Sequence, residues 1–367
     1  MICPRCHNQD PKYFFTFNNV TYCRKCINIG FVNNSPVSFL ATVKSVDYTL
    51  GYELTDLQKE ISRQLLLRYR QHQNTTLKAV CGAGKTEITY EVIKYALNNN
   101  QRVCFTTPRK ELVIELAKRL QSQFKNISIT CVYGGHSKIT DGQFIVCTTH
   151  QLYRYPQSFD LLILDELDAF PYAQNEVLQE ILRNSIKGNY INMSATLTTA
   201  PDLSMTRRYH GHLLDIPKCY LTTPFIMYLW VIKKIKSFIK ARQPVLIFVP
   251  NIKATNNLSK IFKLFGIKSQ PVSSKTPDIH HLIDDLKAHY LDVLVTTTIL
   301  ERGITIDNVQ VIILFGNDRI YTCDTLIQIC GRVGRKTAYP SGSISIFTTY
   351  KTKAIKQCIK TIKQDNA

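Results

Sequence analysis

Short apolar runs, rich in β-branched residues, alternate with helix-like stretches in two separate parts of this sequence, and this alternation constrains the fold more than any other feature. The runs lie at 77–81, 102–107, 127–132, 143–148, 161–165 and 190–194 in the first part, and at 244–249, 293–297, 309–315 and 343–349 in the second. Such alternation is typical of a parallel sheet covered by helices on both faces. The sequence therefore predicts two α/β domains in tandem, over 45–212 and 244–367, with a basic helical connection over 213–243.

The charge balance points to a polyanionic partner. The 367 residues carry 46 Lys and Arg against 27 Asp and Glu, which gives a formal net charge of +19. An excess of this size repels itself in the isolated chain and attracts nucleic acid or an anionic membrane surface. Charge alone does not separate these partners from each other or from the interpretation of a generally basic soluble protein. Apolar residues make up 44% of the chain, which suffices for folded cores and excludes a disordered protein.

Membrane insertion and export are not expected from the sequence. It contains no run of about 18 uninterrupted apolar residues, the length that a membrane-spanning helix needs. The first residues, MICPRCHNQD, lack the apolar segment of a secretory signal. We therefore expect a cytoplasmic protein whose twelve cysteines are reduced thiols or metal ligands.

Residues 1–36 form a segment of their own, set apart by cysteines and aromatic residues. Two Cys-x2-Cys pairs, Cys3 with Cys6 and Cys23 with Cys26, are separated by sixteen residues. Two such pairs supply four thiolates to a tetrahedral Zn²⁺, and a closed set of four ligands is structural rather than catalytic. The other interpretations are four reduced structural cysteines, or His7 as a ligand in place of Cys6.

The function of this segment stays open at the level of sequence. The aromatic run 13–17 and the basic residues Arg5, Lys12, Arg24 and Lys25 suit a surface that stacks bases beside phosphate-binding charge. The same aromatic residues equally suit the small core of the segment or a surface for a protein partner.

A phosphate-binding loop follows the first apolar run. Residues 79–86 read AVCGAGKT, with alanine in place of the usual first glycine, and a helix-like stretch comes next. The backbone N–H groups of Gly82, Ala83 and Gly84 and the helix N-terminus can cradle phosphates. Lys85 would then reach the β/γ oxygens and Thr86 would hold Mg²⁺.

Two further segments complete a site for phosphoryl transfer. The apolar run 161–164 ends in Asp165 and Glu166, acids that would be costly to bury without a cation. Asp165 suits the Mg²⁺ side of the site, and Glu166 suits the group that orients or deprotonates the attacking water. In the second domain, Arg332 and Arg335 lie three residues apart on a glycine-rich turn, where they could stabilise charge on the γ-phosphate.

The series of motifs over about 50–350 resembles helicase superfamily 2. LTDLQ (54–58) is similar to its adenine-reading Gln motif, TPRKE (107–111) to motif Ia, GG (134–135) to the glycine pair after it and TTHQ (148–151) to motif Ib. DELD (165–168) is similar to motif II, SAT (194–196) to motif III, VTTTILERGI (295–304) to motif V and QICGRVGR (328–335) to motif VI. The resemblance implies two RecA-like domains, ATP and Mg²⁺ as cofactors, and a single nucleic-acid strand crossing both domains. Gln328 at the start of motif VI, in place of the His-Arg of DEAD-box RNA remodellers, favours a translocase.

Roles for individual residues follow from the same resemblance. It implies catalytic roles for Lys85, Glu166, Arg332 and Arg335, and nucleotide contacts from Gln58, Gly82, Ala83, Gly84, Lys85, Thr86, Asp165 and Gly303. It implies nucleic-acid contacts from Thr107, Arg109, Lys110, Gly135, Thr149, His150, Thr297 and Arg302. Coupling between hydrolysis and movement would involve Asp168, Ser194, Thr196 and Gln328.

A narrower resemblance is to the ComFA family of late-competence ATPases. It depends on the N-terminal cysteine segment, on CGAGKTE (81–87) and on LDELDAFPY (164–172). The resemblance implies a motor that drives single-stranded DNA uptake beside other competence proteins at the inner face of the membrane. A replication or repair helicase of the PriA type and an ATP-gated scaffold that binds nucleic acid without moving are the alternatives. The sequence does not separate DNA from RNA.

The last predicted helix, over 351–363, carries two distinct faces. Ile355, Cys358, Ile359 and Ile362 share one face at helical spacing, while Lys356, Lys360 and Lys363 form a separate stripe. We interpret the lysine stripe as a solvated face rather than a nucleic-acid contact.

Overall fold

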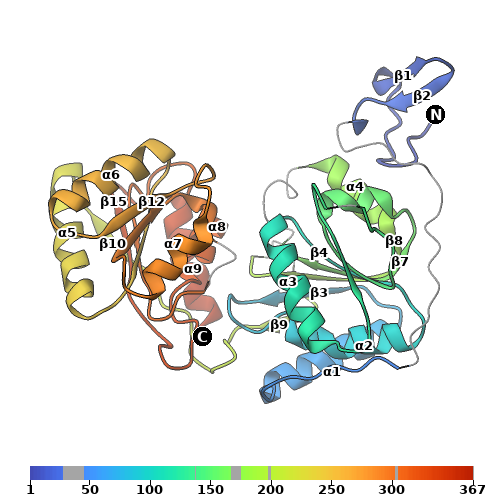
Figure 1. Ribbon diagram of the computed structural model, residues 1–367, viewed down its shortest axis with the longest axis horizontal. Helices are drawn as coiled ribbons and strands as arrows, with labels where there is room; N and C mark the ends of the chain where they lie inside the picture. The colour runs from blue at the N-terminus through green and yellow to red at the C-terminus, as the bar shows by residue number, and fades with distance from the viewer. Residues whose placement is uncertain (28–44, 137, 167–174, 197–199, 302–304, 367) are drawn as a thin grey trace. The chain divides into compact units, whose positions relative to one another are not determined.

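The computed structural model describes residues 1–27, 45–136, 138–166, 175–196, 200–301 and 305–366. The chain divides into two compact units (Figure 1). Unit 1 comprises Met1–Ala79 and Gly84–Ser204, and unit 2 comprises Val80–Ala83 and Met205–Ala367. Among the described residues, no helix combines the length and the apolar character needed to cross a bilayer.

Unit 1 contains a two-stranded sheet near the N-terminus and a seven-stranded sheet. Its elements up to the third long helix are η1 (Pro11–Tyr13), β1 (Phe14–Phe17), β2 (Val20–Cys23), α1 (Asp56–Arg70), β3 (Thr75–Ala79), η3 (Glu87–Thr89), α2 (Tyr90–Asn98), β4 (Val103–Thr107) and α3 (Lys110–Gln123). The remaining ones are β5 (Ile129–Val132), β6 (Phe144–Thr148), η4 (Thr149–Arg154), β7 (Phe159–Asp165), α4 (Glu176–Ser185), β8 (Ile186–Ser194) and β9 (Leu203–Met205).

The large sheet of unit 1 has the strand order β5-β6-β4-β7-β8-β3-β9 and is parallel from β5 to β3. One of its faces is covered by α4, whose Leu178, Ile181 and Leu182 pack against strand residues such as Leu162 and Leu164. Because β4, β7 and β3 are parallel neighbours or near neighbours, the loops that follow them leave the same edge of the sheet. That edge therefore gathers the phosphate loop after β3, motif II after β7 and motif Ia after β4.

Unit 2 contains a six-stranded sheet of order β10-β15-β14-β11-β13-β12, and every pair in it is parallel. Its elements are β10 (Lys218–Leu221), α5 (Pro224–Lys240), β11 (Val245–Phe248), α6 (Ile252–Leu264), β12 (Ser269–Val272), α7 (Ile279–Lys287), β13 (Val293–Thr296), η5 (Thr298–Glu301), β14 (Gln310–Ile313), α8 (Cys323–Cys330), β15 (Ile344–Thr348) and α9 (Lys353–Asp365). The two parallel-sheet units confirm the predicted fold class.

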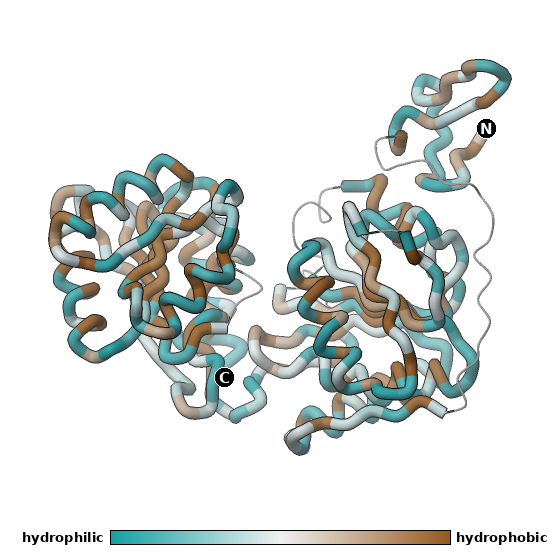
Figure 2. Tube along the Cα trace, in the orientation of Figure 1, coloured by the Kyte–Doolittle hydropathy of each residue, from teal (hydrophilic) through white to brown (hydrophobic). Residues whose placement is uncertain are grey.

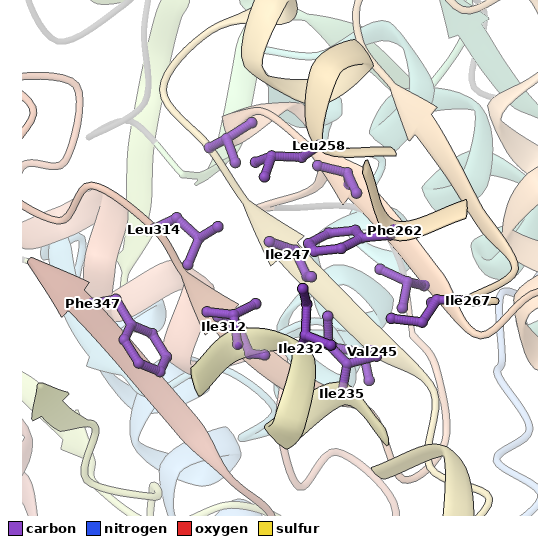
Figure 3. Packing of buried hydrophobic residues seen from close by; sticks show 14 of the residues in the cluster. Ile232, Ile235, Val245, Ile247, Leu258, Phe262, Ile267, Ile312, Leu314 and Phe347 are labelled. Carbon is purple, nitrogen blue, oxygen red and sulfur yellow. The ribbon is translucent and has the colours of Figure 1, made fainter. Parts of the chain in front are cut away.

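The core of unit 2 lies between its strands and helices α5 and α6 (Figure 3). Ile232 and Ile235 of α5 and Phe262 of α6 pack there against strand residues such as Ile247 and Ile312. Burying side chains of this size contributes roughly 1.5–3 kcal/mol each. The apolar residues of both units accordingly concentrate along the strands (Figure 2).

Segment 213–243, interpreted from sequence as a connection between the domains, contains β10 and α5. Strand β10 pairs with β15, and α5 contributes Met227, Val231, Ile232 and Ile235 to the core of unit 2. The segment is thus an integral part of unit 2, and the interpretation as a connection is corrected. The sequence did not indicate that this segment belongs to the core, because lysines are prominent in the last turns of α5 and its apolar residues make their contacts only in the folded unit.

Candidate functional site

The phosphate loop leaves the end of β3 with the backbone geometry that its glycines allow. Gly82 and Gly84 have φ values of 84° and 80°, in the left-handed region that residues with a Cβ atom rarely adopt. A Cβ atom on Gly84 would also lie 2.3 Å from the side-chain amide nitrogen of Gln58. The loop can therefore turn sharply enough to present its N–H groups to a phosphate.

Gln58 is brought against this loop by the start of α1. Thr55 caps the helix by accepting a hydrogen bond from the Gln58 backbone N–H, and the Gln58 side-chain oxygen accepts one from the Thr55 backbone N–H at 2.9 Å. This reciprocal capping box fixes the side chain, which is 3% exposed. Gln58 is thus held beside Gly84, and its contact with adenine stays a prediction.

The lysine of the loop and the first acid of motif II lie together in unit 1. Lys85 Nζ is 3.7 Å from Asp165 Oδ1, and both side chains are mostly buried. Asp165 is the last residue of β7, and the next residue, Glu166, donates its backbone N–H to the Met193 carbonyl at 3.1 Å. Glu166 has a φ of 64°, a conformation that costs of order 1–3 kcal/mol in a residue with a side chain and clusters at active sites.

Thr86, the predicted Mg²⁺ ligand, has a partner that sequence reasoning missed. Arg119 of α3 donates a hydrogen bond from Nη2 to Thr86 Oγ1 at 2.7 Å, and its Nη1 lies 3.7 Å from Glu87 Oε1. The residues around Arg119 form no sequence motif that would predict this contact, because α3 comes close to Thr86 only in the folded unit. An arginine here adds positive charge beside the loop that would receive phosphates.

The predicted coupling residues of motif III lie at the end of β8, which is Ser194, and just beyond it, where Thr196 follows. Ser194 is 1% exposed, and its hydroxyl accepts a hydrogen bond from the Thr196 backbone N–H at 2.9 Å. Strand β8 pairs with β7, and Met193 lies opposite Asp165 and accepts the hydrogen bond from the Glu166 N–H. Ser194, the next residue, therefore lies close to motif II. Asp168, the fourth predicted coupling residue, lies outside the described residues.

In unit 2, motif VI contacts the part of the phosphate loop that belongs to this unit. The Cys81 thiol donates to Gln328 Oε1 at 3.1 Å. Arg332 is 2% exposed and donates from Nε to the Glu301 carbonyl at 2.9 Å, which holds the end of motif V. Arg335 is less buried; its Nε donates to the Gly331 carbonyl at 3.0 Å.

Arg208 is a second arginine that the sequence analysis did not single out. It is 3% exposed, donates from Nη1 to the Gly334 carbonyl at 2.6 Å and from Nε to the Cys81 carbonyl at 3.3 Å, all within unit 2. Burial lowers the pKa of its guanidinium. Arg208 therefore joins the backbone before Gly82 to the turn that carries Arg335.

The predicted nucleic-acid residues of unit 1 lie at or beyond the carboxyl ends of strands. Thr107 ends β4 and Thr149 follows β6, its parallel neighbour; both hydroxyls are buried and have no hydrogen-bond partner within the part of the chain that the structure describes. His150 follows Thr149, and burial lowers the pKa of its imidazole. A buried hydroxyl without a partner is unfavourable, so both threonines are suited to an incoming acceptor.

The structure describes the positions of most of the other residues predicted to contact nucleic acid. Arg109 immediately precedes α3, and Lys110 lies with its Nζ 5.0 Å from the ring centroid of Tyr133. Gly135 has a φ of 84°, and Thr297 follows β13 in unit 2. Arg302 and Gly303 lie outside the described residues.

The four N-terminal cysteines form one compact cluster. Their sulfur atoms all lie within 4.8 Å of one another, with Cys3 and Cys26 at 3.7 Å and Cys6 and Cys23 at 3.8 Å. A tetrahedral site with Zn–S bonds of about 2.3 Å separates its sulfur atoms by about 3.8 Å. The four buried thiols therefore fit Zn²⁺ in both number and spacing.

The aromatic run beside this cluster divides between two environments. Tyr13 and Phe14 pack against the cysteines, whereas Phe15 and Phe17 are 40% and 65% exposed. The Arg24 guanidinium lies 4.2 Å from the Phe15 ring centroid, in the range of a cation–π contact. The run is therefore partly core and partly surface, and base stacking or partner binding by its exposed residues stays a prediction.

Comparisons with known proteins give three family matches and several similar folds. Residues 51–199 match the family described as type III restriction enzyme, res subunit, residues 230–337 match the helicase conserved C-terminal domain, and residues 1–40 match the competence protein ComFA N-terminal domain. Similar folds include a Mycobacterium smegmatis helicase Lhr bound to ssDNA and AMP-PNP (TM-score 0.60, 15% identity, 85% of this chain and 50% of that one). Another is S. cerevisiae Dbp5 bound to RNA and ADP BeF3 (TM-score 0.59, 18% identity, 85% and 88%).

Two relatives that match this chain over nearly all of its residues indicate a narrower family. Competence protein ComFA of Streptococcus pneumoniae is 34% identical over 391 residues, covering 100% of this chain and 90% of that protein. Competence protein ComFA of Bacillus subtilis is 32% identical over 398 residues, covering 99% and 85%. The helicase domains make the chain an ATP-dependent, helicase-like motor that uses ATP and Mg²⁺. With the sequence covered from end to end, the chain belongs to the ComFA family of competence proteins.

Proposed function

We propose that this motor translocates single-stranded DNA and drives DNA uptake in competence. The observation that carries the proposal is the proximity of Lys85 and Asp165, 3.7 Å apart, at the edge where the phosphate loop turns. A lysine and an acid so placed serve a nucleotide's phosphates and its Mg²⁺. Arg335 would stabilise the charge that develops on the γ-phosphate. A catalytic role for Arg332 stays a prediction; in this structure its Nε donates a hydrogen bond to the Glu301 carbonyl.

Several features support single-stranded nucleic acid as the track. The net charge is +19, and the unpartnered hydroxyls of Thr107 and Thr149 lie at the ends of neighbouring strands. Hydroxyls and backbone N–H groups hold a phosphate backbone without reading its bases, as a translocating motor requires. A solved relative in fold, the Lhr helicase, is bound to ssDNA.

We expect ATP turnover to rise several-fold when single-stranded DNA is added, and to rise less with duplex DNA or RNA of equal length. The reason is that strand binding completes the arrangement of residues that hydrolysis needs. Phosphate release, measured in parallel for the three nucleic acids at fixed salt, checks this expectation. Equal turnover with and without single-stranded DNA would overturn the proposed function.

Zinc is the metal that we propose for Cys3, Cys6, Cys23 and Cys26, where it would hold the N-terminal hairpin together. So short a segment has little core of its own, and a structural metal supplies folding free energy instead. Cys23→Ser should release the metal and unfold the hairpin while basal ATP hydrolysis largely survives. Zinc content of the purified chain is the measurement, with Cys131→Ser, which removes a cysteine outside the cluster, as the control. Full zinc content in Cys23→Ser would contradict the assignment.

We also propose that the motor works at the inner face of the cytoplasmic membrane with other competence proteins, and that α5 contacts the lipid. The exposed side of α5 is apolar over its first turns, where Phe225, Leu229 and Trp230 are 75%, 55% and 49% exposed. Toward its end the exposed side chains are Lys233, Lys236, Ser237 and Lys240, and the helix contains no acid. Apolar side chains beside uncompensated lysines complement an anionic lipid surface.

Sedimentation with lipid vesicles tests this contact. The chain should bind vesicles that contain phosphatidylglycerol and not neutral phosphatidylcholine vesicles, and Leu229→Ser should weaken that binding several-fold. Leu264→Ser, which alters an even more exposed leucine of α6, is the control. Identical sedimentation of the two variants would exclude α5 as the lipid contact.

A further inference from the structure

A cavity of about 970 Å³ opens at the carboxyl edge of the sheet of unit 2. It is lined by the segments that leave β14 and β15 and by the first turns of α8 and α9. Strands β15, β14, β11 and β13 are consecutive and parallel in this sheet, so their carboxyl ends share one edge. Thr297, a predicted nucleic-acid contact, follows β13 at that edge, so Thr297 and the cavity lie along the same edge of the sheet.

The cavity is strongly basic. Arg319, Lys353, Lys356 and Lys360 line it, against a single acid, Asp318. The Asp318 carboxylate accepts a hydrogen bond from the Ile320 backbone N–H at 3.0 Å. Within the described part of the chain, none of the four basic side chains forms an ion pair. Four basic groups that line one cavity with so little compensation repel one another, and an anion relieves that repulsion.

Two tyrosines also line the cavity, and a site for inorganic phosphate alone would not need their aromatic rings. Tyr350, just beyond β15, lines the cavity and is 59% exposed, so one face of its ring is available for stacking. Tyr321, also in the lining, is 2% exposed, and its hydroxyl has no hydrogen-bond partner among the described residues. Exposed aromatic rings beside basic groups are the usual components of a surface for single strands.

We propose that this cavity is a further contact for the single strand, in which Lys356, Lys360 and their basic neighbours hold phosphates and Tyr350 stacks on a base. The inference rests on the proposed function, since it takes the translocated strand as the ligand. It departs from the interpretation of the lysine stripe of α9 as a solvated face, because Lys356 and Lys360 line the cavity, while Lys363 does not. The site would add contacts between unit 2 and the strand to those expected from motif V.

The test is the salt dependence of binding, measured by fluorescence anisotropy with labelled dT20 and the full chain. Removing one phosphate-binding charge lowers the slope of log affinity against log salt by about 0.7 for a single strand, so Lys356→Ala/Lys360→Ala should lower it by about 1.4. The matched control is Lys260→Ala/Lys363→Ala, which removes two exposed lysines outside the cavity and should keep the wild-type slope. Basal ATP turnover without DNA should be unchanged in both double variants.

Tyr350 supplies an independent measurement on the same cavity. Tyr350→Ala should weaken dT20 binding ~10-fold, within the range that removal of one stacked base produces. Tyr350→Phe, which keeps the ring, should bind like the wild type, a rescue that a structural role of the hydroxyl would not produce. A wild-type slope in Lys356→Ala/Lys360→Ala would overturn this site while leaving the proposed function intact. Absence of dT20 binding by the wild-type chain would overturn both.

Discussion

Replacing Lys85 with alanine is expected to abolish ATP turnover, with a decrease of at least 10²–10³-fold, the usual effect of removing one preorganised charge contact from a transition state. Lys85 is the loop residue whose ammonium lies 3.7 Å from Asp165, at the place where the γ-phosphate and its Mg²⁺ would be held. Without it, both nucleotide affinity and the stabilisation of the transferring phosphoryl group should fall. Phosphate release and binding of a fluorescent ATP analogue measure the two effects.

The matched control for this substitution is Lys94→Ala. Lys94 lies on α2, in the same unit, and pairs at the surface with Asp47 at 2.9 Å. An exposed pair of this kind contributes little to stability, so this variant should turn over ATP at the wild-type rate. If Lys85→Ala retained the rate of Lys94→Ala, residues 79–86 would not form a nucleotide site.

Glu166→Gln should give a different defect: hydrolysis slower by about 10²–10⁴-fold with nucleotide affinity retained. Glutamine keeps the size of the side chain but cannot accept a proton from the attacking water. The left-handed backbone at this position, with φ of 64°, and the hydrogen bond to Met193 are expected to survive an isosteric change. The variant should therefore accumulate with ATP bound, which nitrocellulose retention of labelled ATP and single-turnover hydrolysis report separately.

A second glutamate tests whether the effect belongs to the site. Glu176→Gln changes a side chain on α4 that is 85% exposed, and it should leave hydrolysis unaffected. Loss of ATP binding in Glu166→Gln would assign the residue to nucleotide affinity rather than to activation of water. A wild-type rate would remove it from the mechanism.

The features that the sequence predicted correctly are those encoded over a few neighbouring residues. The alternation of apolar runs indicated two parallel sheets, because strand and helix periodicities are local. The spacing of the cysteine pairs similarly anticipated a cluster, because a Cys-x2-Cys turn fixes two thiols at once. The LTDLQ motif singled out Gln58 through resemblance, although only the fold brought its side chain against Gly84.

Tertiary structure alone decided which distant residues meet at the site. Arg119 reaches Thr86, and Arg208 joins Cys81 to Gly334, through contacts that depend on the order of strands and the packing of helices. The same holds for the basic cavity, where Arg319 and Lys356 converge because β14 and β15 are neighbours. A lysine stripe read along one helix cannot reveal a cavity whose other wall comes from a different strand. The sequence by itself thus determined the local chemistry of each segment, whereas the three-dimensional order of the sheets determined which segments act together.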